Sequence, residues 1–258
     1  MLPRGHPFVL VLFLVLFPSP SRSAPDVDSA TLLADAALAE SRFDPATALV
    51  LYRRAATARP DDPLLLQKIA RQLSDLSDDA PTAGEKQRLL TEALALSHRA
   101  VELAPDNAVN LLSVAICYGK LANIADTRTR IEYSRALRDY AQRALAADPS
   151  YAYAHHLLGR WHHEVATLGA TKRFLVRLIY GALPPASKAE AIRHLQRAVE
   201  LEPDSPSHRV ELGFVLLADG QTAAAQRTLA EALAIPPKER HDTAALRRAR
   251  TALHSLPR

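Results

Sequence analysis

The sequence predicts an all-α protein in which antiparallel helix pairs stack into a solenoid. Composition gives the first reason: Ala and Leu dominate, Gly occurs 8 times and aromatic residues make up only 5% of 258 residues, so good helix formers fill the chain. An internal repeat gives the second reason. A segment with Arg-Ala, and a proline five residues after that alanine, recurs along the chain, which is typical of repeat architectures.

Four segments carry this repeat, and a fifth Ala/Pro pair follows them. They are LYRRAATARPDDPLLL (51–66), LSHRAVELAPDNAVNL (96–111), YAQRALAADPSYAYAH (140–155) and HLQRAVELEPDSPSHR (194–209), followed by Ala232 and Pro237. Mostly small residues stand twelve positions before and ten positions after these prolines, so antiparallel helices can approach closely. The proline ends the second helix of each pair. The Leu-Gly pairs at 158–159 and 212–213 extend the similarity to the tetratricopeptide consensus.

The repeat predicts a tetratricopeptide-like helical-hairpin solenoid of about five helix pairs plus a C-terminal capping helix. We expect first helices at about 28–40, 63–77, 107–122, 151–168 and 205–219, second helices at about 45–58, 86–103, 131–146, 187–201 and 221–235, and the capping helix at about 239–255. Each pair buries one face only against its neighbours, so the array must stack and curve.

The first 23 residues have the pattern of a targeting segment. Arg4 precedes an apolar run of ten residues at 8–17, and prolines and serines follow it up to Ser23, which is typical of a secretory signal peptide. The run is shorter than the roughly 20 residues of a membrane-spanning helix. We expect residues 1–23 to be a signal peptide, residues 24–258 to form the repeat domain, and the chain to be exported (periplasmic or secreted). The alternative is an uncleaved signal anchor that holds the chain at a membrane by residues 8–17.

In tetratricopeptide arrays, fixed positions of each first helix line the concave groove. Transferred by the repeat prolines, they predict groove residues Val109, Leu112, Ile116, Lys120, His156, Arg160, His163, Val210, Phe214 and Leu217. The helices after Pro105 and Pro203 contribute strongly apolar sets, and an open groove of that kind indicates a partner. We therefore predict a groove for an apolar or amphipathic partner. The alternative is that the insertion at 168–186, or the terminal helices, fill the groove.

The insertion at 168–186 alternates basic and apolar residues. Lys172, Arg173 and Arg177 stand among Phe, Leu, Val and Ile, so the segment could lie on an anionic lipid or membrane surface. The alternative is an elongated helix that packs back on the array and keeps its basic groups in solvent.

No motif predicts an enzyme, a cofactor or a metal site. In the histidine-rich segment around residue 160, the same-face pairs His155/His162 and His156/His163 are seven residues apart. That is about 10.5 Å of helix rise, too far for one ion. We expect His156 and His163 to make groove binding pH-dependent instead.

The single cysteine, Cys117, lies in an apolar run that would raise its pKa, and no Gly-x-Ser-x-Gly or phosphate-binding loop occurs. The net charge of +4 is spread along the chain, so no nucleic acid is expected.

The order of these features resembles the regulator of microtubule dynamics family. The matching stretches are EALALSHRAVELAPDNA (92–108), SVAICYGKLANIADTRTRIEYS (113–134), HHLLGRWHHEV (155–165) and RFLVRLIYGALPPASKAEAIRHLQRAVELEPD (173–204). The resemblance implies a tetratricopeptide-like adaptor without a catalytic motif. It also implies an association with microtubules and, for some members, anchoring to organelle membranes by an N-terminal segment. The N-terminus of this chain departs from that pattern, because it has the features of an export signal.

Three functional hypotheses follow. The first is a non-enzymatic protein-binding scaffold that holds a helical or extended peptide partner in its groove. The second is lipid binding or transfer in the same groove, and the third is a microtubule-associated role that requires a membrane anchor facing the cytosol. Peptide binding predicts an open groove with polar rims, whereas lipid binding predicts a closed apolar tunnel. Microtubule binding predicts salt-sensitive cosedimentation.

Overall fold

The computed structural model describes residues 27–169, 179, 181 and 184–256. The predicted signal segment at 1–23 and most of the insertion at 168–186 therefore lie outside the described residues.

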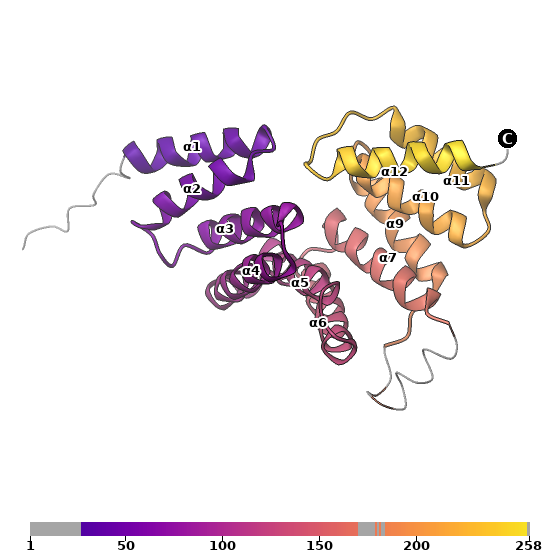
Figure 1. Ribbon diagram of the computed structural model, residues 1–258, viewed down its shortest axis with the longest axis horizontal. Helices are drawn as coiled ribbons and strands as arrows, with labels where there is room; N and C mark the ends of the chain where they lie inside the picture. The colour runs from indigo at the N-terminus through magenta and orange to yellow at the C-terminus, as the bar shows by residue number, and fades with distance from the viewer. Residues whose placement is uncertain (1–26, 170–178, 180, 182–183, 257–258) are drawn as a thin grey trace, which may run out of the picture.

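The described residues form an all-α solenoid of helix pairs and contain no strand, as the repeat predicts (Figure 1). The pairs are α1/α2, α3/α4, α5/α6, α7/α9 and α10/α11, and α12 packs on the last of them. The helices are α1 (Val27–Ser41), α2 (Pro45–Ala56), α3 (Pro63–Leu76), α4 (Ala83–Leu103), α5 (Ala108–Ala122), α6 (Thr127–Ala147), α7 (Ala152–Thr167), α9 (Lys188–Leu201), α10 (Pro206–Ala218), α11 (Thr222–Leu233) and α12 (Asp242–Ser255), with a short 3-10 helix η1 (Ser77–Asp79) after α3.

Side-chain caps define where several of these helices begin. Asp62 accepts hydrogen bonds from the backbone N–H groups of Leu64 and Leu65, and Pro63 occupies the first position of α3, where its missing N–H costs nothing. Other first-turn caps are Asp44 for α2, Thr82 for α4, Asn107 for α5, Asp126 for α6 and Ser187 for α9. The polar residues before these six helices therefore fix where each of the six begins.

Small residues bring the two helices of a pair close together, as the repeat predicts. Ala93 and Ala115 are completely buried. At Gly159 of α7, an added Cβ would lie 2.6 Å from Leu195 Cγ and 3.1 Å from the carbonyl oxygen of Ala191, both on α9. The absence of a side chain at residue 159 therefore sets the distance between α7 and α9.

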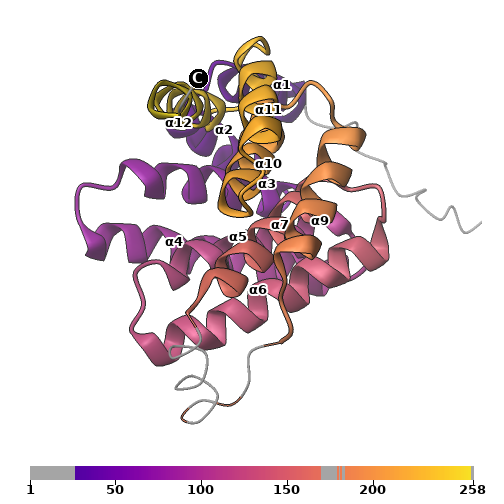
Figure 2. The ribbon, with the colours of Figure 1, turned by 90° about the vertical axis from the view of Figure 1, so that its right-hand side faces the viewer.

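The stacked pairs curve, so that the C-terminal part of the chain returns toward the N-terminal part. In Figures 1 and 2, the chain bends back after α11, and in Figure 1 the connection that precedes α12 comes close to the C-terminal end of α3. The connection between α11 and α12 contacts α3 directly, through an ion pair between Arg71 and Glu239. Of the helices described, none is both long and apolar enough to cross a membrane.

We expect Gly159→Ala to lower the free energy of unfolding by about 1–3 kcal/mol, because the new methyl group would overpack the α7/α9 interface. Gly84 of α4 is the matched control, since an added Cβ there has nothing within 4 Å. Gly84→Ala should raise the free energy of unfolding by about 0.5–1 kcal/mol. Urea titrations of the two variants test this, and a similar shift in both would contradict the packing argument.

Candidate binding cavity

A cavity of about 1130 Å³ lies on the concave side of the array, lined by residues of α3, α4, α5, α6, α7, α10 and α12. Its floor is apolar. The floor residues include Val109, Leu112, Ile116, Leu137, Leu157, Trp161 and Val165. The volume lies slightly above the range of about 300–1,000 Å³ that is typical of small-molecule sites. The cavity can therefore take a ligand at least as large as a typical small molecule.

Six of the ten groove residues predicted from the sequence line this cavity, all from α5 and α7: Val109, Leu112, Ile116, Lys120, His156 and Arg160. The seventh on these helices, His163, is half-buried on α7 outside the cavity lining.

The three residues predicted on α10 pack against the capping helix instead. Val210 is fully buried in a cluster with Ala245 and Ala249 of α12, and Phe214 and Leu217 pack at its edge. The guanidinium of Arg248, also on α12, lies 4.6 Å from the centre of the Phe214 ring. Because α12 covers the apolar face of α10, the terminal helix fills this part of the groove.

Paired charges surround the apolar floor. Glu211 of α10 accepts a hydrogen bond of 2.8 Å from Arg248, and Arg160 of α7 lies 3.9 Å from the same carboxylate. Arg160 also pairs with Glu164 at 3.5 Å. The rim is therefore polar with balanced charges, and it does not select strongly for either sign of charge.

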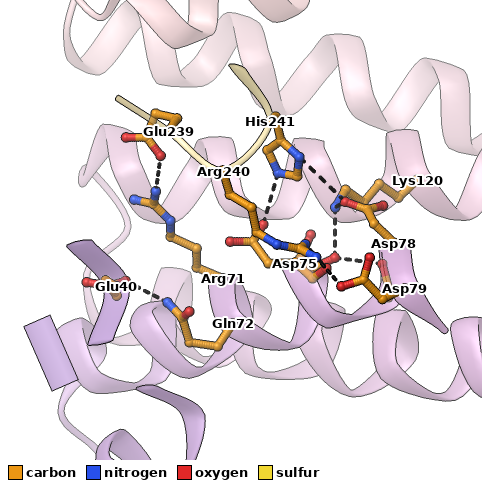
Figure 3. A network of polar contacts seen from close by, with 12 residues as sticks. Glu40, Arg71, Gln72, Asp75, Asp78, Asp79, Lys120, Glu239, Arg240 and His241 are labelled. Atoms are coloured by element: carbon orange, nitrogen blue, oxygen red, sulfur yellow. Dashed lines mark hydrogen bonds and ion pairs between the residues drawn. The ribbon is translucent and has the colours of Figure 1, made fainter. Parts of the chain in front are cut away.

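We call the contacts between residues 239–241 and the α3/η1 segment the clasp (Figure 3). Glu239 pairs with Arg71 at 2.5 Å, and His241 Nε2 lies 3.1 Å from Asp75 Oδ1. Arg240 donates to the carbonyl oxygen of Asp75 at 2.5 Å and pairs with Asp79. Burial would raise the pKa of Asp75, but the hydrogen bond with His241 and the nearby charges of Lys120 and Arg71 outweigh it and hold that pKa below its usual value.

Lys120 of α5 joins the same network. Its ammonium group donates to the carbonyl oxygen of Ser74 at 2.7 Å and to Asp78 at 2.9 Å. A lysine predicted to face a partner thus ties α5 to the end of α3 while it lines the cavity. The clasp links residues more than 160 positions apart, so no local sequence pattern indicated it.

Histidines of α7 meet histidines of other helices on both of its sides. His156 Nδ1 lies 3.0 Å from His208 Nδ1 of α10, and His155 Nδ1 lies 2.9 Å from His194 Nδ1 of α9. His162, Glu190 and His194 each offer one ligand atom, and these three atoms lie within 4.8 Å of one another. His194 and His208 lie on other helices, so the spacing of histidines along α7 does not indicate these contacts.

The thiol of Cys117 is not suited to nucleophilic catalysis. Its side chain is 2% exposed, and burial raises the pKa of the thiol to about 11. At neutral pH it is therefore a neutral, space-filling group next to Ser97.

The fold and the cavity define a tetratricopeptide-type helical scaffold. Residues 32–257 match the sequence profile of the family "Regulator of microtubule dynamics protein 1-3". The chain belongs to this family.

Individual relatives agree with that assignment. The chain is 28% identical to regulator of microtubule dynamics protein 3 of Xenopus laevis over 69% of its own length, and 25% identical to protein 1 of Bos taurus over 56%. The matched segments span 38% and 46% of these relatives, which is less than half of each.

Solved structures show the same fold. A thermophilic TPR protein of Thermus thermophilus has a TM-score of 0.65 at 23% identity, with 88% of this chain and 99% of that chain covered. MamA of Desulfovibrio magneticus has a TM-score of 0.51 at 16% identity, with coverages of 82% and 97%. These similarities establish the tetratricopeptide architecture.

We expect Arg240→Gln to lower the free energy of unfolding by about 1–2 kcal/mol, because it removes a charged hydrogen bond and an ion pair of the clasp. Arg250→Gln on the exposed face of α12 is the control and should change it by less than about 0.5 kcal/mol. Urea titrations measure both values. A double-mutant cycle with Asp79→Asn should give a coupling energy above zero, and additive effects would show that the clasp pair contributes nothing.

Stability should fall on acidification through His208. This imidazole is fully buried, and burial lowers its pKa to about 4, against the opposing effect of Asp242. The unfolded chain, with an ordinary histidine pKa near 6.5, binds the extra proton between pH 6.5 and 4. The free energy of unfolding therefore falls in this window, by up to about 1.4 kcal/mol per pH unit.

Urea titrations between pH 4.5 and 7.5 measure this slope. His208→Gln should reduce it by the contribution of one histidine, because burial also lowers the pKa of His156 and His194. His254→Gln at the exposed end of α12 should leave it unchanged. Parallel pH profiles for His208→Gln and the wild type would rule out His208 as the source.

Proposed function

We propose that this chain is a non-enzymatic protein-binding scaffold that holds an amphipathic segment of a partner protein in the concave cavity. Family membership and the tetratricopeptide-type fold support a protein-binding helical scaffold in general. The observation that carries the specific proposal is an apolar floor on α5 and α7 surrounded by a rim of paired charges.

The floor and the rim suit different parts of a peptide. Val109 is 42% exposed and Ile116 is partly buried, and both line the cavity from α5, where apolar side chains of a helix or extended segment would bind. Leu112 lies between them on the helix and is 2% exposed, so it supports this surface from the core. The rim carries Arg160, Glu164 and Glu211, which can exchange their mutual ion pairs for contacts with polar groups of a peptide. A lipid tunnel would instead be closed and apolar, so the polar rim favours a peptide.

Site-specific photocrosslinking in the native host tests the proposal. A benzophenone amino acid at residue 116 should give an adduct with one polypeptide, identified by mass spectrometry. The same amino acid at Val50, which is 58% exposed on α2 and does not line the cavity, is the matched control. Val109→Glu should reduce the adduct at residue 116 by about fivefold or more, because it puts a charge on the apolar floor.

Each other outcome argues against the peptide proposal. An adduct of lipid mass at residue 116 would replace the peptide with a lipid. Polypeptide adducts of equal yield at residues 116 and 50 would show that the cavity is not the binding site.

Family membership supports a second proposal, a microtubule-associated role. The relatives are named regulators of microtubule dynamics, although the matched segments span less than half of them. This role requires residues 8–17 to anchor the chain so that the repeat domain faces the cytosol, whereas a cleaved signal at 1–23 would export it. Cosedimentation with polymerised tubulin at low and high salt tests the contact. Binding that is absent at low salt would end this proposal.

A further inference from the structure

We propose that His162, Glu190 and His194 form a divalent metal site, best suited to Zn²⁺, that fastens α7 to α9. One ligand atom from each residue lies within 4.8 Å of the other two. Two histidines and one carboxylate are a known zinc ligand set, and a water molecule in the fourth position completes the tetrahedron. None of these three residues lines the concave cavity, so the site is separate from the proposed peptide site.

The two helices bring the ligands together by simple geometry. Glu190 and His194 are four residues apart on α9 and therefore share one face. His162 reaches them from α7, and its ring stacks on that of His194 with the ring centres 5.6 Å apart. Only one ligand comes from α7, so the seven-residue spacing of the histidines on that helix does not exclude this site.

Hydrogen bonds fix which nitrogen of His194 carries the lone pair. The carbonyl oxygen of Pro149 can only accept, so His155 Nε2, at 3.2 Å, carries a proton and donates to it. In neutral His155, Nδ1 is then an acceptor, and His194 Nδ1, at 2.9 Å, must donate to it. His194 Nε2 therefore keeps its lone pair, and it accepts a long hydrogen bond of 3.4 Å from Arg193 that a metal would have to displace. Metal-binding histidines commonly donate their second N–H in this way, which fixes the ring and its tautomer.

His162 supplies an independent observation. Its side chain is 9% exposed, and Nδ1 is buried without a hydrogen-bond partner among the described residues. An unpaired polar atom in that position costs free energy, and coordination of a metal ion by this nitrogen would compensate for it. Both imidazoles are largely buried, which disfavours their charged form, and the neutral form is the one that binds metal.

Arg193 has two opposing effects on the site. Its guanidinium donates to both oxygens of Glu190, which orients the carboxylate as an outer partner of a metal ligand. Its positive charge also repels the ion.

The position of the site suggests what the ion would do. Residues 168–187 lie between α7 and α9 in the sequence, so this helix pair is joined by a longer connection than the other pairs. An ion held by both helices would fasten them directly. The expected role is structural stabilisation of the pair.

Zinc titration of the full chain, after treatment with a chelator, tests the proposal. Isothermal calorimetry should show one Zn²⁺ per chain, and both His162→Gln and His194→Gln should weaken binding by at least about tenfold. His163→Gln is the matched control, since it is the neighbouring histidine on the same helix but outside the three-residue group. It should keep the wild-type affinity within about twofold.

Two further measurements separate the metal site from a folding defect. Circular dichroism should show the same helix content for all metal-free variants. Zn²⁺ should slow amide hydrogen exchange in α7 and α9 of the wild type and of His163→Gln, but not in the two ligand variants. No binding by the folded wild type, or unchanged affinity in His162→Gln and His194→Gln, would overturn the proposal.

Discussion

The close approach of the two helices in each pair is the constraint on which the rest of the structure depends. Alanines such as Ala93, Ala115 and Ala198 are completely buried between helices, and at Gly159 and Gly213 even a methyl group would collide with a leucine of the paired helix. Helices packed this closely have one remaining apolar face, which they bury against the next pair. Repetition of this contact gives the array its curvature, and the curvature creates a concave side on which α5, α7 and α12 enclose the cavity.

The magnitudes of the interactions indicate what holds the array together. The pair Arg71–Glu239 is 43% and 37% exposed, and exposed pairs contribute about 0–1 kcal/mol each. Burial of one large apolar side chain, such as Leu90 or Leu229, contributes about 1.5–3 kcal/mol. The apolar contacts between helices therefore stabilise the fold, and the clasp sets the position of the C-terminal connection on the concave side. A contact of this strength can separate without unfolding the helix pairs that it joins.

The sequence was sufficient to predict the helices and their pairing, because those features depend on local rules. Prolines such as Pro105 and Pro203 follow the second helices directly, and caps such as Asp62 precede the first helices. The groove residues on α5 were predicted by counting positions from the same prolines, and Val109, Leu112 and Ile116 do line the cavity. Their counterparts on α10 follow the same register, yet α12 covers them. The repeat describes each pair in isolation and contains no information on where the capping helix packs.

The remaining features depend on contacts between distant segments. The clasp joins α3 to residues 239–241, and the histidine contacts of α7 involve His194 and His208 on other helices. In the local sequence, each of these residues is typical of a charge in solvent or of a histidine on the face of a helix. Their significance appears once the curvature of the array brings the segments together, which is why spacing along one helix gave an incomplete description of the histidines.

Helix α7 connects the two regions in which function is proposed. One side of it carries His156, Arg160 and Trp161 into the cavity, and the other side carries His155 and His162 against α9. The helix is continuous from Ala152 to Thr167. A movement of α7 relative to α9 would therefore also move the cavity wall. Any interaction that fixes the α7/α9 interface reduces the conformational freedom of that wall, and a partner that binds the wall then loses less entropy on binding.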